Sequence, residues 1–283
     1  MNINYKKIIN NESFGEERAL YNSDGLKLLN CKFEGIEDGE SALKESRNLM
    51  VLDCDFKLRY PFWHVTNAII EKSRLYETCR APLWYSKNIG FLDCDMKGPK
   101  CLRECENITF KNSNIVSTEF GWKSNGIEIS DSKIEGEYCF LDSNNIVMNN
   151  VNLKGKYSFQ YVKGLKIENS YIDTKDAFWH VKDAIIVNST IKGEYLAWYS
   201  SNVTFINCVL EGTQPFCYCH NLKMINCVMN NCDLAFERST GLDIDVKSEV
   251  ISVKNPYSGI VRIEKIGEIM IDDDNAKAKI ESN

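Results

Sequence analysis

The stretches ITFKNSNI (residues 108–115) and VTFINCVL (residues 203–210) decide the fold of this chain. Each opens with an apolar-x-apolar triplet, continues with Asn and then Ser or Cys, and ends on a returning aliphatic residue. The pattern restarts at a nearly constant step of ~19 residues, a period that indicates a solenoid in which each copy is one structural coil. Only one step, from Ala68 to Ile89, is slightly longer. The ten copies open at Leu49, Ala68, Ile89, Ile108, Ile127, Ile146, Leu165, Ala184, Val203 and Leu222.

The spacing inside each copy favours a β-solenoid. Positions 0, 2, 5 and 7 of a copy are apolar or small, which is strand alternation and not a helical period. β-branched and aromatic residues crowd these positions, and Gly, Asn and Asp fall between the runs, where turns form. The leucine-rich-repeat pattern is absent, and the step is not a multiple of the period of hexapeptide helices. We therefore expect an all-β, right-handed, single-stranded parallel β-helix of about eleven coils, including one that opens at Leu26.

The 283 residues are expected to form a single domain, 1–283, whose β-helix coils span 26–241. Residues 1–25 lack the repeat and are expected to form an N-terminal cap, because an open sheet edge invites pairing with other chains. Residues 242–283 lose the Asn-Cys signature but keep alternating strand patterns. We expect these C-terminal strands to close the other end.

Composition excludes several classes of partner. The net charge of −6 leaves no basic stripe for nucleic acid. No run approaches the ~18 apolar residues of a membrane span, so we expect no membrane partner. The polar N-terminus resembles no signal peptide, and twelve cysteines without an export signal are typical of free thiols in a reducing compartment. The expected location is cytoplasmic.

The most distinctive residues lie late in each copy, at positions 14 and 15. Position 13 is apolar in almost every copy and is expected to point inward, whereas charges at positions 14 and 15 would be costly inside so narrow a coil. Stacking of the coils turns positions 14 and 15 into one outward stripe that holds all five tryptophans, here called the aromatic stripe. Its predicted ligand-binding residues are Trp63, His64, Trp84, Tyr85, Trp122, Tyr161, Trp179, His180, Trp198 and Tyr199.

Three interpretations of the aromatic stripe are open. The leading hypothesis is a groove for a carbohydrate or a similar ring-bearing ligand. A second is structural, because aromatic side chains on a sheet face also stack on one another and under loops. A third is a scaffold that associates with itself as a homo-oligomer. The near-identical strings at 62–70 and 178–186 place His64 and His180 six coils apart, or ~29 Å, too far to share one centre.

A charged interval of the stripe supplies the catalytic candidates Arg103, Glu104, Lys123 and Asp142. Glu104 and Asp142 would lie two coils apart, about 10 Å, which is at the wide end of the separation in inverting glycosidases. Arg103 and Lys123 could neutralise an anionic sugar. A carbohydrate-active lyase, hydrolase or isomerase is therefore the alternative function. The competing interpretation is a solvated face with cross-strand ion pairs.

The sequence predicts neither a metal site nor a cofactor. The strings CYCHN (217–221) and CLREC (101–105) group cysteines, but neither has C-x-x-C spacing, and most of the cysteines follow the ladder positions of the repeat. There is no glycine-rich phosphate loop, nucleophile elbow or H-E-x-x-H motif.

Four further strings carry a family resemblance: GEERALYNSDGLKLLNCKF (15–33), PFWHV (61–65), APLWYS (81–86) and SVKNPYSG (252–259). Together they resemble an uncharacterised bacterial family of unknown function whose members are expected to form pectin-lyase-like right-handed β-helices. The resemblance covers nearly the whole chain. It implies the fold and a bacterial, cytosolic source, and it implies no activity. The Asp and Arg or Lys cluster of pectin-lyase-like enzymes has no residue-by-residue match here.

Overall fold

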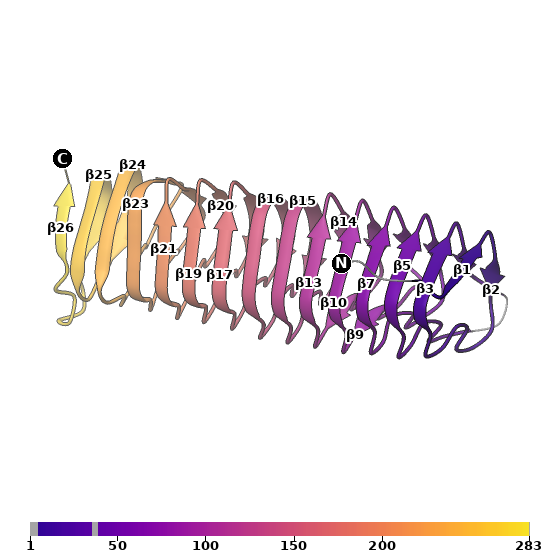
Figure 1. Ribbon diagram of the computed structural model, residues 1–283. Coiled ribbons are helices and arrows are strands. Elements are labelled where there is room, and N and C mark those ends of the chain that lie inside the picture. Colours follow the sequence, from indigo (N-terminus) through magenta and orange to yellow (C-terminus); the bar gives the residue numbers. More distant parts are fainter. Residues whose placement is uncertain (1–4, 36–38, 283) are drawn as a thin grey trace. The chain divides into compact units, whose positions relative to one another are not determined.

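The computed structural model describes residues 5–35 and 39–282, and every regular element in these residues is a β-strand. Strands of successive coils lie side by side and run parallel, as Figure 1 shows. The predicted all-β parallel β-solenoid is therefore confirmed, with about fourteen turns where about eleven were expected. The chain divides into two compact units, unit 1 over Met1–Phe140 and unit 2 over Leu141–Asn283.

Unit 1 contains two principal parallel ladders and a short third one. Within each ladder the strands pair in register, coil upon coil, as in Ile89↔Ile108 and Ile108↔Ile127. The first ladder consists of β1 (Lys7–Asn10), β3 (Asp24–Leu29), β5 (Arg47–Leu52), β7 (Thr66–Glu71), β10 (Lys87–Leu92), β13 (Glu106–Lys111) and β15 (Asn125–Glu137). The second consists of β2 (Ser13–Phe14), β4 (Lys32–Phe33), β6 (Asp55–Phe56), β8 (Arg74–Leu75), β11 (Asp95–Lys97), β14 (Asn114–Val116) and the end of β15. The third pairs β9 (Leu83–Trp84) with β12 (Leu102–Arg103).

Unit 2 repeats the two principal ladders. Its first ladder consists of β16 (Asn144–Lys156), β17 (Lys163–Glu168), β19 (Lys182–Val187), β21 (Ser201–Ile206), β23 (His220–Asn230), β24 (Leu242–Lys254), β25 (Gly259–Met270) and β26 (Lys279–Ser282). Its second consists of β18 (Tyr171–Lys175), β20 (Thr190–Lys192) and β22 (Val209–Glu211), flanked by the ends of β16 and β23.

The additional turns lie in the two segments that were expected to be terminal caps. Strand β1 pairs in register with β3, Lys7 opposite Leu26, so residues 7–14 already follow the step of the repeat. The repeat was hidden there because Lys7 stands where the other copies have an apolar residue. At the other end, β24 pairs with β25 at a shorter step, Leu242 opposite Gly259, with an irregularity between Val246 and Glu249. This shortened step breaks the sequence period but not the stacking.

Like side chains stack inside each unit to form the core. Phe33 lies parallel to Phe56 with ring centroids 4.5 Å apart, and Phe91 stacks on Phe110 at 4.8 Å. The position-13 residues are buried as predicted, including Phe62 in unit 1. Phe159 and Phe178 form a matching buried pair in unit 2, with centroids 5.0 Å apart. The coil spacing of a parallel sheet, ~4.8 Å, is what brings equivalent rings to this distance.

The Cys/Ser column predicted from position 5 is an internal ladder with a hydrogen-bonding role. The Ser113 hydroxyl accepts from the Cys94 backbone N–H at 3.2 Å and donates to the Lys111 carbonyl at 2.9 Å. The Ser132 hydroxyl likewise accepts a hydrogen bond from the Ser113 backbone N–H at 3.0 Å. A small polar side chain therefore satisfies buried backbone groups at a bend where the β ladder is interrupted.

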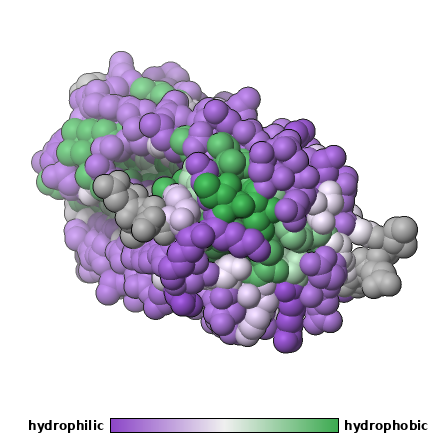
Figure 2. All heavy atoms as spheres, turned by 45° about the vertical axis from the view of Figure 1, so that its right-hand side comes forward, coloured by the Kyte–Doolittle hydropathy of each residue, from purple (hydrophilic) through white to green (hydrophobic). Residues whose placement is uncertain are grey.

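Exposed asparagines stand at the second residue of several first-ladder strands, where the backbone is left-handed. Asn88 and Asn107 have φ values of 57° and 56°, a region that Asn tolerates better than most residues. Their amides also bond along the stack, with Asn107 Nδ2 donating to Asn88 Oδ1 at 3.1 Å. In unit 2, Asn221 donates to Asn202 at 2.9 Å. Figure 2 shows a mostly hydrophilic surface on the face it displays, with apolar side chains gathered in a few patches.

Candidate functional site

Positions 14 and 15 of the repeat form a tight corner between strands, and this corner determines how the aromatic stripe is displayed. Position 15 has a left-handed backbone in both units, with φ of 56° at His64, 57° at Tyr85 and 59° at Tyr199. Because the backbone turns at position 15, the position-14 and position-15 side chains form two separate columns. The two columns have different surroundings.

The position-14 tryptophans are half-buried, and each is hydrogen-bonded to the backbone of the next coil. Each indole Nε1–H donates to a carbonyl of the following coil, as from Trp84 to Lys100 at 2.9 Å and from Trp179 to Tyr195 at 2.7 Å. Trp63 stacks on Trp84 with ring centroids 5.1 Å apart and an interplanar angle of 5°. The same bonding holds for Trp63, Trp122 and Trp198.

Arg103 completes the tryptophan column of unit 1. Its guanidinium carbon lies 4.7 Å from the ring centroids of both Trp84 and Trp122, so the cation is enclosed between two indoles. Arg103 Nη2 also forms an ion pair with Glu119 at 3.0 Å, and Lys100 contacts the same carboxylate at 3.4 Å. Within the described residues, Arg103 Nε is buried without a hydrogen-bond partner. This predicted catalytic residue is therefore committed to internal contacts.

The position-15 rings form a more exposed column. In unit 2, Tyr161, His180, Tyr199 and Tyr218 stack in sequence with centroid distances of 4.7, 5.0 and 4.8 Å and interplanar angles of 6°, 9° and 9°. We call this set the ring column. Tyr161 and Tyr199 are 54% and 46% exposed, so their hydroxyl-bearing edges reach solvent. Among the described residues of unit 1, the equivalent contact joins His64 and Tyr85, with centroids 5.0 Å apart.

Electrostatics keep the imidazole of the ring column neutral. Partial burial lowers the pKa of His180 below its usual value, and the nearby Lys182 ammonium lowers it further. Burial, followed by the Glu237 carboxylate, raises the pKa of Tyr218. At neutral pH the ring column therefore presents three phenolic hydroxyls and one neutral imidazole.

The remaining predicted catalytic residues are all exposed at position 15. Glu104 and Lys123 lie in unit 1, with left-handed backbones at φ of 50° each, and Asp142 lies in unit 2 with φ of 54°. Since Glu104 and Asp142 belong to different units, their expected separation stays a prediction, as does that of His64 and His180. Arg103 contacts two tryptophans and the carboxylate of Glu119. The sequence had not suggested Glu119 as its partner.

Two residues were absent from the predicted site. Glu119 reaches Arg103 from a later part of the solenoid, and nothing in the repeat marks that pairing. Tyr218 is the fourth ring of the column, and its position 15 in the repeat could have identified it.

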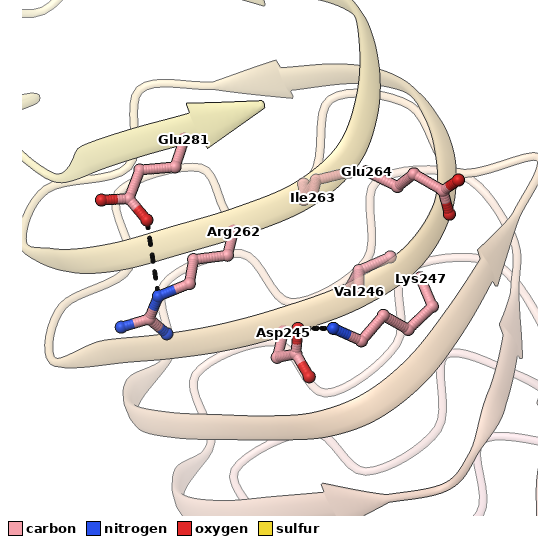
Figure 3. A pocket seen from close by; sticks show the side chains of 7 residues that line it. All are labelled: Asp245, Val246, Lys247, Arg262, Ile263, Glu264 and Glu281. Carbon is pink, nitrogen blue, oxygen red and sulfur yellow. Dashed lines mark ion pairs between the residues drawn. The ribbon is translucent and has the colours of Figure 1, made fainter. Parts of the chain in front are cut away.

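Polar hollows of the described surface lie away from the aromatic stripe. One of about 430 Å³ in unit 1 is bordered by Asp93, Asp95 and Asp131 together with Asn112 and Lys133. Another, of about 300 Å³, follows β24 to β26, and Figure 3 shows Arg262 reaching Glu281 and Lys247 reaching Asp245 beside it. Ion pairs at 3.5 and 2.6 Å join these residues.

The cysteines lie in the interior of the solenoid. All twelve are buried free thiols, and burial raises the pKa of Cys54 to about 12 and that of Cys94 to about 11. Among residues 5–35 and 39–282, no three His, Cys, Asp or Glu side chains are placed to hold a metal ion. No helix in the same residues is long and apolar enough to cross a membrane.

Comparisons with known proteins place the chain in a family. It belongs to the family described as protein of unknown function (DUF3737), whose model matches residues 7–282. No curated protein matches the chain.

Solved structures resemble this chain in fold. The surface adhesin PfbA of Streptococcus pneumoniae is 8% identical, with a TM-score of 0.39 over 97% of this chain and 82% of the adhesin. The periplasmic alginate epimerase AlgG is 12% identical, with a TM-score of 0.29 over 92% and 77%. The catalytic domain of a GH87 α-1,3-glucanase is 10% identical, with a TM-score of 0.22 over 99% and 63%. These β-helix proteins therefore include carbohydrate-active enzymes and an adhesin.

Proposed function

We propose that this member of the DUF3737 family binds a linear carbohydrate along the ring column of unit 2. The observation that carries the proposal is the register of Tyr161, His180, Tyr199 and Tyr218. Their centroids lie 4.7, 5.0 and 4.8 Å apart, and two of the tyrosines are about half exposed. The column offers one hydroxyl or imidazole per coil at constant spacing, close to the length of one sugar unit in an extended chain.

The chemistry of the column suits hydroxyl groups. A phenol donates and accepts hydrogen bonds, and the neutral imidazole of His180 does both through its two nitrogens. Sugar hydroxyls need both kinds of partner. Ring edges beside them supply apolar contact for the C–H groups of a pyranose.

The stacking limits which ligands fit. Each inner ring of the column has its two faces covered by its neighbours, so a ligand meets ring edges and not open faces. Nucleic-acid bases bind single-strand sites by stacking on open aromatic faces, which supports a sugar over a nucleotide. The net charge of −6 points the same way.

The tryptophans have a supporting role in this proposal. Trp198 is in edge contact with Tyr199 and with Tyr218, at 6.3 and 5.6 Å, and its indole N–H is held by the Gln214 carbonyl at 2.7 Å. We therefore assign Trp198 to fixing the ring column from behind, and Trp179 to supporting Trp198, on which it stacks with ring centroids 5.5 Å apart. Trp198 is also a natural fluorescent reporter for a ligand at Tyr199.

The test is a fluorescence and calorimetric titration of the full chain with neutral and acidic oligosaccharides. The double substitution Tyr161→Phe/Tyr199→Phe keeps both rings and removes two hydroxyls, and each lost hydrogen bond is worth about 1 kcal/mol. We expect affinity to fall at least about tenfold. The matched control is Tyr171→Phe, a tyrosine that is 41% exposed and outside the column.

Either of two results would refute the proposal. The first is that no oligosaccharide of the panel produces a response. The second is that Tyr171→Phe weakens binding as much as the double substitution does.

A further inference from the structure

Two lysines beside the ring column of unit 2 form a pair of like charges. Lys163 opens β17 two residues after Tyr161, and Lys182 opens β19 two residues after His180. The two lysines are directly opposite each other in the register of β17 and β19, so their Cα atoms lie about one coil, ~4.8 Å, apart. Both are exposed, and within the described residues neither ammonium forms an ion pair. Like charges at such a distance repel each other.

The equivalent position in unit 1 carries opposite charges. This position stands two residues before the next copy opens, and there Lys87 of β10 is opposite Glu106 of β13, with an ion pair of 2.8 Å. In unit 2 the residues on either side of the lysine pair are Asn144 and Ser201, which carry no charge. The column therefore offers the two lysines no carboxylate, and their charge stays uncompensated beside the ring column.

The surroundings of Lys182 direct its charge toward the ring column. Asp183 is its acidic neighbour in sequence, but that carboxylate accepts a hydrogen bond from Asn202 Nδ2 at 2.8 Å and forms no ion pair with the lysine among the described residues. Burial lowers the pKa of His180, and the Lys182 ammonium lowers it further. The lysine charge thus acts on a ring of the column, where it would also act on a bound ligand.

We propose that the carbohydrate bound by the ring column carries a negatively charged group, a carboxylate or a sulfate, which is held between the ammonium groups of Lys163 and Lys182. This inference rests on the proposed function and names the class of its ligand. An anion between the two ammonium groups replaces their repulsion by two charge-assisted contacts. Asp142 and Glu237 occupy position 15 on either side of the ring column, so the attraction is confined to a few coils. A short acidic saccharide therefore fits better than a long polyanion such as nucleic acid.

The test is a calorimetric titration of the full chain with tetrasaccharides in matched pairs. The pairs are an oligouronate with its methyl ester and a sulfated oligosaccharide with its desulfated form, so that each pair differs only in charge. We expect the acidic member to bind at least about tenfold more tightly at low ionic strength, an advantage of about 1.4 kcal/mol. The advantage should shrink in 1 M salt, where the Debye length falls to about 3 Å. Comparison of the two acidic probes decides between carboxylate and sulfate.

A charge-removing variant tests the lysines themselves. Lys163→Gln/Lys182→Gln should weaken binding of the acidic tetrasaccharide about tenfold and leave binding of its neutral form unchanged. The matched control is Lys154→Gln/Lys192→Gln, which removes the same net charge from the second ladder of the same unit. The melting temperature of the first variant should not fall, because it relieves a repulsion, so lost binding is distinguishable from lost fold.

Three results would overturn this inference and leave the ring column as a site for neutral sugars. They are equal affinity for the acidic and neutral members of both pairs, an equal effect of the control variant, and an acidic tetrasaccharide whose binding does not depend on the two lysines. A single-stranded oligonucleotide that binds more tightly than every tetrasaccharide would also contradict it. If no saccharide binds at all, the proposed function itself fails.

Discussion

Removal of Arg103 tests whether the tryptophan column is a structural element. Arg103→Ala deletes two cation–π contacts of 4.7 Å, each worth about 1 kcal/mol at a partly buried site. It also removes the ion pair with Glu119, about 1 kcal/mol, and the packing of the aliphatic stem, about 1–2 kcal/mol. Relief of the buried, unpartnered Nε offsets about 1 kcal/mol. The expected net loss is about 3–4 kcal/mol of unfolding free energy.

Urea unfolding followed by far-ultraviolet circular dichroism and by tryptophan fluorescence measures this loss. The two probes are compared because stacked repeats can unfold in parts. The control is Lys123→Ala, an exposed position-15 residue one coil further on, which should change stability by less than about 0.5 kcal/mol. If Arg103→Ala and Lys123→Ala are equally mild, the enclosed guanidinium does not stabilise the column and our assignment of Arg103 fails.

Two further predictions concern the interior. Ser113→Ala leaves the Cys94 N–H without its acceptor and should lower the unfolding free energy by about 1–2 kcal/mol. Ser113→Cys keeps a residue type that the column uses elsewhere and should lower it by less than half of that. Equal losses for the two variants in thermal denaturation would contradict the hydrogen-bonding role. Burial raises the pKa of Cys54, Cys105 and Cys219 to about 12. Thiols of the unfolded chain ionise near pH 8.5 while these stay protonated, so stability should fall as pH rises from about 8.5 toward 12, and a flat profile in urea titrations would count against it.

The columns of the fold were predictable because the period itself places residues. Once Ile108 and Ile127 are known to share a position, their pairing in adjacent strands follows from stacking, and so does the burial of the Cys/Ser ladder. The turn count was underestimated where local changes interrupt the pattern. Lys7 occupies an apolar position in an otherwise regular coil, and β24 pairs with β25 at a shortened step. Backbone pairing tolerates both changes because its hydrogen bonds do not depend on side-chain identity.

For the candidate site, the sequence predicted which residues share a column but not which contacts their side chains make. Sequence places Trp84, Arg103 and Trp122 at one position of three successive copies, but their side-chain torsions decide whether they splay into solvent or lie flat on one another. The acceptors of the indole N–H groups are backbone carbonyls, such as that of Lys100. Every residue has such a carbonyl, so the sequence does not reveal which one accepts. The partner of Arg103 is likewise set by the path of the loop that carries Glu119. For these reasons the sequence suggested a catalytic role for Arg103, whereas the structure shows its guanidinium enclosed between Trp84 and Trp122.

Stacking along the coils also constrains what the surface can recognise. A column of parallel rings uses its faces internally, so only edges and polar atoms remain for a ligand, one set per coil. Extending the ring column by another coil would add a contact without changing the spacing, whereas a substitution that removes one inner ring, such as His180→Ala, would leave both neighbouring rings without a stacking partner. Recognition by such a surface should therefore scale with ligand length. In the titrations proposed above, longer oligosaccharides should bind more tightly until the four rings are spanned, and affinity should then level off. Affinity that is independent of length would place any binding at a single ring and not along the column.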